Sequence, residues 1–305
     1  MSELPPLSWG KCFPENICEI PAVLDQLHAA GVRRISLESP SLKHCGKDKA
    51  FRDVLLRETA ARNMLLHDTH APFGAMESLG YPVPGKGEIA TNSVRNAIEM
   101  ASILGIQTLT VHLARTRLVG PYAPEGILYP SENLPAARER ILRQLDVLVP
   151  LAEKNKVVMA LENLFLPSST AAFLATVVPE INSPYLGYCY DAGHALLLEN
   201  QPGKRTEDLI DWVRNGWSDD KVILQPDQLD IMLPHVVTCH LHDNHGLNDE
   251  HLLPGNGAAD WTKIVDRLKT APRLISLQTE LIHHVADSVP LEDQIAVYAK
   301  IGLKL

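Results

Sequence analysis

Histidines and carboxylates recur along this chain where chemistry on a metal ion would need them. They supply imidazole nitrogen and carboxylate oxygen, the ligands that zinc, manganese and similar divalent ions take in proteins. Each lies at or just after a segment with the pattern of a β-strand. The set is His70, His112, Glu162, Asp191, His194, His240, Asp249, His251 and Glu280. Ligands so far apart in the chain can meet only if the strand ends converge.

Strand-like and helix-like segments alternate along the chain and predict such a convergence. The clearest helix is 91–104, where apolar residues keep helical spacing and Gly105 follows. Further helices are expected at 20–30, 48–62, 135–154 and 291–301. Strands are expected at 7–9, 34–38, 64–68, 108–112, 157–161, 186–190, 236–239 and 274–277. About eight strand–helix units favour a (β/α)8 TIM barrel, whose strand ends share one face. A doubly wound open sheet would place its ligands at one switch point instead.

The whole chain, residues 1–305, is expected to form a single barrel domain, because no linker rich in Gly, Ser or Pro divides it. The stretch 195–234 is too long for one crossover helix and contains Trp212, Trp217 and Pro226. We expect it to be an insertion that lies beside the site or at a subunit contact.

Composition favours a reduced, cytoplasmic protein that does not bind nucleic acid or membranes. The net charge of −9 is unfavourable for binding a phosphate backbone. The five cysteines are odd in number and none forms a C-x-x-C pair, as in proteins of a reducing compartment. Cys189 and Cys239 lie near the acid and histidine cluster, and packed strand thiols are a simpler interpretation than metal ligands. No signal peptide or apolar run of roughly 18 residues is evident.

Two segments carry the sharpest chemical signals in the first two thirds of the chain. Glu162 follows five apolar residues, and a buried carboxylate is costly unless it is paired or bound to metal. A salt bridge is the alternative. Asp191 ends a strand, Gly193 permits a tight turn, and His194 comes three residues after Asp191, so that both could reach one centre. The alternative is a helix-capping Asp and a solvated His.

The richest segment is His240-Leu241-His242-Asp243-Asn244-His245. Alternation along a strand sends His240 and His242 to the same side. An Asp-x-His pattern follows at Asp249 and His251, before the loop Pro254-Gly255-Asn256-Gly257. A cluster this dense indicates a site. His70 and His112, by contrast, could be outer groups of the site or buried core histidines.

These segments together resemble the xylose-isomerase-like TIM barrel superfamily, in particular its sugar phosphate isomerase/epimerase branch, which is related to endonuclease IV. The resemblance extends from about Trp9 to Ile301. It is carried by His70-Ala71-Pro72-Phe73, Leu161-Glu162-Asn163, Asp191-Ala192-Gly193-His194, and the segment from His240 to Gly257. It implies an enzyme with a divalent cofactor, namely Mn, Zn, Co or Mg.

The resemblance also implies roles for single residues. In the isomerase branch one ion is held by positions that match Glu162, Asp191, His240 and Glu280, and the two glutamates are the catalytic groups that move protons. The endonuclease IV branch holds three zinc ions. Its additional positions match His70, His112, His194, Asp249 and His251. In a mononuclear enzyme, substrate contacts would come from His70, His112, His194 and His242.

The expected function is therefore that of a metal-dependent sugar or sugar phosphate isomerase or epimerase that works through an enediolate. The alternatives are an endonuclease IV-like hydrolase acting on abasic DNA, a dehydratase or lyase of the same superfamily, and a binding barrel without turnover. Arg115, Arg117, Lys204 and Arg205 could bind one phosphate or carboxylate but are sparse for a duplex. The expected partner is a small sugar or sugar phosphate, and a homo-oligomer is left open.

Overall fold

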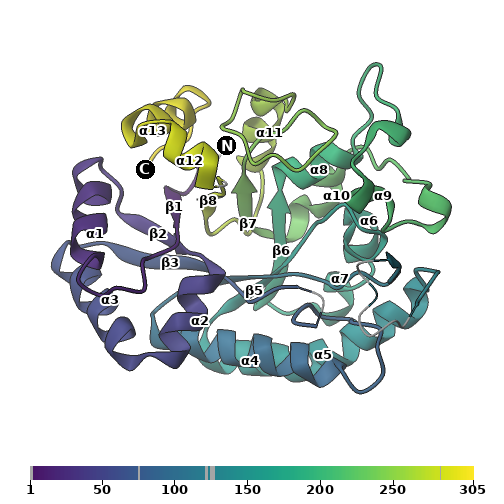
Figure 1. The fold of residues 1–305 in the computed structure, drawn as a ribbon, viewed down its shortest axis with the longest axis horizontal. Helices are drawn as coiled ribbons and strands as arrows, with labels where there is room; N and C mark the ends of the chain where they lie inside the picture. Colours follow the sequence, from purple (N-terminus) through teal and green to yellow (C-terminus); the bar gives the residue numbers. More distant parts are fainter. Residues whose placement is uncertain (1–2, 75, 121–122, 124–127, 282) are drawn as a thin grey trace.

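The chain folds around a closed barrel of eight parallel strands that follow one another in chain order (Figure 1). The computed structural model describes residues 3–74, 76–120, 123, 128–281 and 283–305. The strands are β1 Leu7–Lys11, β2 Arg34–Leu37, β3 Leu65–His70, β4 Thr108–Val111, β5 Val158–Glu162, β6 Leu186–Asp191, β7 Val236–Leu241 and β8 Leu277–Thr279. Closure through the β1–β8 pair confirms the predicted (β/α)8 TIM barrel.

The helices surround the barrel, as expected for strands joined by right-handed crossovers. They are α1 Ile20–Ala29, α2 Ser39–Lys47, α3 Lys49–Ala61, α4 Gly87–Ile103, α5 Leu134–Asn155, α6 Ala171–Leu174, α7 Val178–Ile181, α8 Ala192–Leu198, α9 Asp211–Arg214, α10 Gln228–Met232, α11 Trp261–Leu268, α12 His283–Ser288 and α13 Leu291–Lys300. Among the described residues, no helix is long and apolar enough to span a membrane.

Several predicted boundaries were displaced. Helix α4 begins four residues before the expected start, and α2 was not expected at all, because its polar sequence lacks an apolar stripe. Strand β8 begins at Leu277, three residues later than predicted. Strand β3 continues to His70, so this histidine ends the strand instead of lying beyond it. None of these shifts moves a predicted ligand away from the end of its strand.

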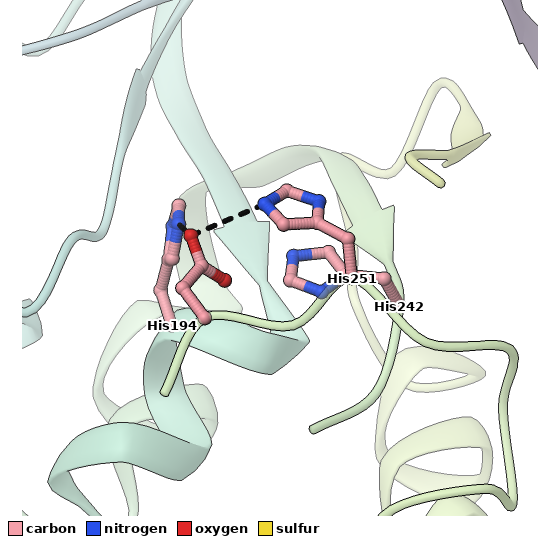
Figure 2. A group of neighbouring side chains, drawn as sticks. His194, His242 and His251 are labelled. Atoms are coloured by element: carbon pink, nitrogen blue, oxygen red, sulfur yellow. Dashed lines mark hydrogen bonds and ion pairs between the residues drawn. The ribbon is translucent and has the colours of Figure 1, made fainter. Parts of the chain in front are cut away.

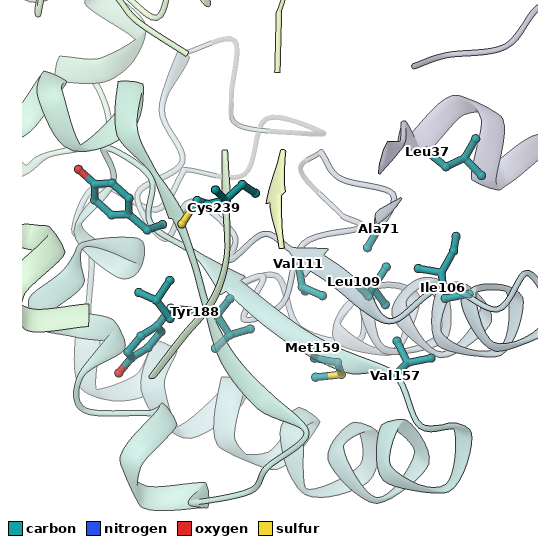
Figure 3. Packing of buried hydrophobic residues seen from close by; sticks show 14 of the residues in the cluster. Leu37, Ala71, Ile106, Leu109, Val111, Val157, Met159, Tyr188 and Cys239 are labelled. Atoms are coloured by element: carbon teal, nitrogen blue, oxygen red, sulfur yellow. The ribbon is translucent and has the colours of Figure 1, made fainter. Parts of the chain in front are cut away.

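The main apolar core lies between the barrel and its surrounding helices, and Figure 3 shows part of it. Strand β4 illustrates the pattern, since Leu109 and Val111 are buried in this core. Thr108 and Thr110 alternate with them, and their hydroxyls contact Asp68 and His240 respectively. Alternation along the strand therefore sends apolar side chains towards the helices and polar ones to the barrel interior.

The barrel interior holds a hydrogen-bonded network in place of purely apolar layers. The Ser36 hydroxyl of β2 donates past β1 to the Gln278 side chain of β8 at 2.5 Å. Gln278 in turn donates to the Thr238 hydroxyl at 2.6 Å, which lies 2.7 Å from that of Ser276. Asp68 is completely buried nearby and pairs with His67. The polar groups satisfy one another, which limits the desolvation penalty of burying them.

The predicted insertion between β6 and β7 forms a separate lobe at one side of the barrel mouth. Beyond α8 it contains the 3-10 helices Thr206–Asp208, Ser218–Asp220 and Leu233–His235, together with α9 and α10. Trp217 and its apolar neighbours pack against the segment after β5, where Trp217 Nε1 donates to the Phe165 carbonyl at 2.9 Å. The lobe thus has a small core of its own, adjoining the strand ends that carry the candidate ligands.

Candidate metal centre

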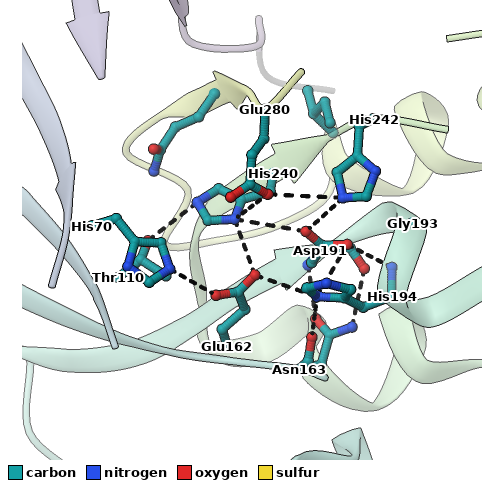
Figure 4. A network of polar contacts seen from close by, with 12 residues as sticks. His70, Thr110, Glu162, Asn163, Asp191, Gly193, His194, His240, His242 and Glu280 are labelled. Atoms are coloured by element: carbon teal, nitrogen blue, oxygen red, sulfur yellow. Dashed lines mark hydrogen bonds and ion pairs between the residues drawn. The ribbon is translucent and has the colours of Figure 1, made fainter. Parts of the chain in front are cut away.

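The strand ends bring together four of the predicted ligands, here called the core group. Glu162 and Asp191 end β5 and β6, His240 is the penultimate residue of β7, and Glu280 directly follows β8. Strand register places Asp191 beside His240. Each residue of the group offers a ligand atom within 4.8 Å of the others (Figure 4). The convergence inferred from the barrel prediction is therefore found in the structure.

Glu162 also belongs to a second set, the β3–β4 group, which contains His70 and His112. Its Oε2 lies 2.8 Å from His112 Nε2 and 3.3 Å from His70 Nε2. Its Oε1 lies 3.1 Å from His240 Nδ1 on the other side. The two oxygens of this buried carboxylate thus face different groups of imidazoles, which is the placement of a carboxylate that bridges two ions.

A third set contains His194, His242, Asp249 and His251, and Figure 2 labels its three histidines. The name loop group is used here for His194, Asp249 and His251, because His242 has a different role, described below. Asp249 Oδ2 lies 3.2 Å from His194 Nε2 and 3.1 Å from His251 Nε2. His194 belongs to α8, whereas Asp249 and His251 belong to the loop after β7. The Asp-x-His segment of the loop, Asp249 to His251, therefore comes together with His194 of the Asp-Ala-Gly-His segment.

Three histidines are held in the orientation that metal-binding histidines adopt. Nδ1 of His70 donates to the Ala71 carbonyl at 2.7 Å, and Nδ1 of His251 donates to the Glu280 carbonyl at 2.9 Å. His194 Nδ1 likewise donates to the Asn163 carbonyl at 3.1 Å. In each ring Nε2 is left to face the carboxylates. A backbone carbonyl that fixes the far nitrogen is the usual partner of a ligating histidine.

The core group holds more negative charge than its protons can satisfy. His240 Nδ1 lies 3.0 Å from Glu280 Oε2, 3.1 Å from Glu162 Oε1 and 3.6 Å from Asp191 Oδ2. A ring nitrogen carries at most one proton, so it cannot donate to three carboxylates. Asp249 Oδ1 is buried without a hydrogen bond, and Glu280 Oε2 makes none in good geometry although His240 Nδ1 lies 3.0 Å away. These features and the all-nitrogen-and-oxygen donor set fit divalent cations.

The histidines and carboxylates of these groups shift one another's pKa values. Burial alone would raise the pKa of Glu162, but the imidazoles of His240 and His112 outweigh it and lower that pKa well below its usual value. Burial likewise opposes charge on His194, yet the carboxylates of Asp191 and Asp249 raise its pKa well above the usual value. Metal ions and protons therefore compete for the same nitrogens.

Asp191 has two functions at once. Its Oδ1 accepts a hydrogen bond from the His194 backbone N–H at 2.6 Å, so it caps the start of α8. Its Oδ2 accepts from His242 Nε2 at 3.0 Å and faces the core group. The Asn163 side chain pairs with the Asp191 backbone through bonds of 2.7 and 3.0 Å. Capping and ligation are therefore compatible here.

His242 is completely buried and contacts Asp191 instead of the cavity described below. Its ring stacks on that of His251 with centroids 3.8 Å apart. Parallel rings cannot both aim in-plane lone pairs at one ion, so His242 supports the ligands from outside. A Cβ on Gly193 would lie 2.1 Å from His242 Cε1. Gly193 lies within α8, so the structure requires glycine there for this close packing and not for the expected tight turn.

The loop that carries Asp249 and His251 is tied to the barrel by Asp243. This buried carboxylate accepts hydrogen bonds from the backbone N–H of Asn244 and Gly255, at 2.9 and 2.8 Å, and from that of Ala259 at 3.1 Å. It also accepts from Trp261 Nε1 at 2.8 Å. His251 has a left-handed backbone with φ of 49°, which a non-glycine residue adopts only where its surroundings impose it.

A cavity of about 430 Å³ opens beside the centre. Three predicted ligands line it: His112 of the β3–β4 group, and His194 and Asp249 of the loop group. Apolar and aromatic residues make up most of the remaining wall, namely Phe73, Tyr81, Leu113, Ala114, Leu118, Leu164, Phe165, Leu166 and Trp212. A molecule in this cavity would meet the second and third ligand sets directly.

Sequence reasoning missed the residues that support the centre or line the cavity. Asp243 and Asn163 lie in the sequence next to predicted site residues, His242 and Glu162. This proximity was the only indication in the sequence that they could belong to the site. Trp212 was noted only as part of the insertion that was expected beside the site or at a subunit contact, and it lines the cavity together with His194 and Asp249. Phe165 had no signal of its own. Cys189 is buried and lies within reach of Glu162 and His240, and burial raises its pKa to about 12, so it remains a thiol.

The four basic residues considered for phosphate or carboxylate binding are engaged by the protein itself. Arg115 donates to the Trp212 carbonyl, and Arg117 to the carbonyls of Pro130 and Asn215. Lys204 donates to three carbonyls at the end of α8. Arg205 pairs with exposed Asp208. Arg115 alone of the four lines the cavity.

The closed barrel and its clustered ligands define a (β/α)8 protein with a candidate metal centre at the carboxyl ends of its strands. A family model described as the xylose isomerase-like TIM barrel matches residues 20–295. The chain belongs to this family. The resemblance seen in the sequence is thereby confirmed. The uncharacterized protein y4fM of Sinorhizobium fredii is 25% identical over 261 residues, which cover 79% of this chain and 74% of that protein.

Solved structures share the fold at low sequence identity. The 3-keto-D-glucoside 4-epimerase YcjR of E. coli superposes with a TM-score of 0.67 and 13% identity, covering 96% of this chain and 98% of that one. The family 2 AP endonuclease of Brucella melitensis gives 0.65 and 14%, covering 97% and 99%. Proteins described as a sugar epimerase and as an AP endonuclease thus share this fold. At such identities, the likeness shows the fold alone.

Proposed function

We propose that this protein is a metal-dependent hydrolase that cleaves a phosphoester in a small molecule, with more than one ion held around Glu162. One observation carries the proposal: the two oxygens of Glu162 face opposite sets of imidazoles, His70 and His112 on one side and His240 on the other. A carboxylate placed this way suits a bridge between ions. With both oxygens engaged by imidazoles, it is poorly placed to exchange a proton with a substrate carbon.

Divalent ions bound here would polarise the phosphoryl group and supply an activated water, the chemistry of multinuclear phosphatases and nucleases. The chain itself would hold them through three ligand sets that share or adjoin Glu162. The backbone carbonyls of Ala71, Asn163 and Glu280 keep three imidazoles aimed inwards. Glu280 is the most accessible carboxylate of the core group, with its side chain 32% exposed. It is therefore the carboxylate of this group best placed to exchange a proton with solvent.

A small substrate is favoured over a DNA duplex for two reasons. The net charge of −9 opposes binding to a phosphate backbone. The basic residues considered for such binding are also engaged elsewhere, with Arg117 and Lys204 donating to backbone carbonyls and Arg205 paired with Asp208. The cavity of about 430 Å³ lies within the size range of small-molecule sites.

The proposal is tested by counting metals and measuring hydrolysis on the same sample. Elemental analysis of the zinc- or manganese-loaded protein is expected to give two to three ions per chain. Metal-dependent release of p-nitrophenol from bis(p-nitrophenyl) phosphate and p-nitrophenyl phosphate is expected, with loss in Glu162→Gln. One ion per chain and no hydrolysis of either compound would overturn the proposal.

The second candidate is a metal-dependent sugar or sugar phosphate isomerase or epimerase. The observation that favours it is the core group itself, where Glu162 and Glu280 approach one ligand cluster together with Asp191 and His240. In this candidate the two glutamates pass a proton between carbons or faces of the substrate. The loop group and the β3–β4 group would then contact substrate oxygens instead of ions.

Deuterium exchange distinguishes the two candidates. The isomerase predicts exchange into a ketose or ketose phosphate in D2O with one ion per chain, and loss of exchange in both Glu162→Gln and Glu280→Gln. The hydrolase predicts no exchange. A protein that binds a single ion and exchanges deuterium would establish the second candidate in place of the first.

A further inference from the structure

The apolar wall of the cavity has no role in the chemistry proposed above, yet it directly adjoins the ligands. Phe73 stands 52% exposed at the rim, with its ring centroid 4.7 Å from that of His112. Phe165 lies 5.4 Å from His194 on the opposite side, and Trp212 lies edge-on to Phe165 at 4.5 Å. Aromatic rings therefore border ligand histidines from both the β3–β4 group and the loop group.

We infer that this wall is a subsite for a flat apolar ring attached to the group that reacts at the metal centre. The reacting group is a phosphoester if the proposed function holds, and to that extent the inference rests on it. The ring subsite itself follows from the wall. Aromatic pairs favour edge-to-face and offset geometries, and the perpendicular pair of Phe165 and Trp212 offers a ring such surfaces.

The wall is fixed in place before any ligand arrives. Arg115 Nη2 donates to the Trp212 carbonyl at 2.6 Å, which joins the segment after β4 to the insertion. Trp217 Nε1 donates to the Phe165 carbonyl and holds the neighbouring segment. A Cβ on Gly216 would lie 2.5 Å from Leu166 Cδ2, so the insertion packs closely here. A preformed wall reduces the entropy lost when a rigid ring binds.

The same wall is poorly suited to a polyhydroxylated substrate. Among its described residues the polar side chains other than candidate ligands are Ser78, Tyr81, Arg115 and the indole N–H of Trp212. Ser78 donates to the Gly74 carbonyl at 2.9 Å, and Arg115 is engaged with Trp212. Several sugar hydroxyls buried here would lack partners, which costs about 1 to 3 kcal/mol for each unsatisfied group. A ring loses no hydrogen bonds on entry.

The test measures binding of a matched pair of probes by calorimetry, so that it does not depend on turnover. Phenylphosphonate and methylphosphonate carry the same anionic group and differ in the ring. The metal-loaded wild type is expected to bind phenylphosphonate roughly tenfold to a hundredfold more tightly, the range given by burial of one aromatic side chain. Trp212→Ala is expected to reduce the preference to less than threefold, whereas Trp212→Phe keeps most of it.

Two controls separate the subsite from general damage to the fold. Ile223 lies on the same insertion, is 63% exposed and does not line the cavity, so Ile223→Ala is expected to keep the full preference. Metal content and melting temperature are measured for every variant. A preference lost equally in Ile223→Ala and Trp212→Ala contradicts the assignment to the wall.

Failure of the subsite and failure of the proposed function give different results. Equal binding of the two phosphonates to a protein that hydrolyses phosphoesters overturns the subsite and leaves the function. Binding of benzyl alcohol that is lost in Trp212→Ala supports the subsite even if neither phosphonate binds. Tighter binding of D-fructose than of benzyl alcohol in the cavity overturns the inference.

Discussion

The core group and the loop group are built in different ways, although both consist of histidines and carboxylates. In the core group, strands or positions directly beside them carry every ligand, as with Asp191 and His240 in paired register. In the loop group, Asp249 and His251 lie on an irregular segment whose place depends on hydrogen bonds to Asp243. The first therefore takes its geometry from the barrel and the second from a local network.

Because of this difference, a substitution can disturb the ligand positions of one set and leave those of the other in place. A ligand at the end of a buried strand keeps its place as long as the barrel closes. A ligand on a loop depends on each anchoring hydrogen bond. Glu162 joins the core group to the β3–β4 group, whereas no single residue of the core group lies in the loop group. Substitutions can therefore separate the sets.

The largest effect is expected from Glu162→Gln. This change removes the charge that the β3–β4 group and the core group share, so both should lose their ions while the loop group keeps its own. Activity is expected to fall at least roughly a thousandfold, beyond the tenfold to hundredfold typical of outer positions. Elemental analysis checks the count, with Glu280→Gln as the control that removes a ligand of the core group alone. Full metal content in Glu162→Gln would refute the bridging role.

The next effect is expected from Asp249→Asn. The loop group loses its carboxylate, and one ion per chain should be lost while the ions of the other two groups remain. Activity should fall by about a hundredfold, since two ion sites persist. The check is elemental analysis combined with initial rates. Loss of all metal would show that the sets are not separable.

Asp243→Asn tests the anchor of the loop instead of a ligand. The amide keeps the shape but loses the charge that accepts from Gly255, Ala259 and Trp261. Affinity of the loop group for its ion is expected to fall about tenfold to a hundredfold, with the core group unchanged. Metal titration against a competing chelator measures this. Equal weakening of both groups would argue for a general loss of stability.

The smallest effect is a pH dependence confined to the metal-free protein. Burial opposes charge on His251, but its hydrogen bond to Asp249 raises its pKa to about 9, above the ordinary 6.5. A raised pKa contributes stability fully below pH 6.5, and this contribution is lost as the pH rises towards 9. The melting temperature measured in EDTA should therefore fall over that pH range. Metal binding releases the proton, so the loaded protein should not show this loss.

Two measurements sharpen the pH prediction. In EDTA, Asp249→Asn should flatten the dependence of melting temperature on pH. The substitution removes the carboxylate that contributes most to raising the pKa of His251. A wild-type melting temperature that does not change between pH 6.5 and 9 in EDTA would contradict the assignment of protons to the loop group.

The positions of the core ligands could be predicted from the sequence because each follows a short apolar run that is readable as a strand. Glu162 after its run and Asp191 after the next predict one meeting point once a closed barrel is assumed. The register of the actual strands confirms it. His240 and His242 were also correctly placed on one side, and both lie within reach of Asp191.

The cavity and the orientation of the histidine rings could not be predicted, since both depend on contacts between segments that are distant in the sequence. Arg115 meets Trp212, 97 residues later in the chain, and no local pattern indicates that pair. The orientation of His251 depends on the Glu280 carbonyl, which lies 29 residues away. The bridging position of Glu162 likewise needs four strand ends in register. Such features arise from tertiary packing, and no periodic pattern in the sequence indicates them.

The polar interior of the barrel has a consequence for the mouth above it. Gln278 is linked to Ser36 on one side and to Thr238 on the other, and it lies two residues before Glu280. Packed methyl groups tolerate sliding, whereas hydrogen bonds have preferred lengths and directions. These bonds therefore fix the position of β8 relative to its neighbour β7 and to β2, the strand on the far side of β1. Glu280 directly follows β8, so its position at the mouth of the barrel is fixed by bonds that lie one layer below it.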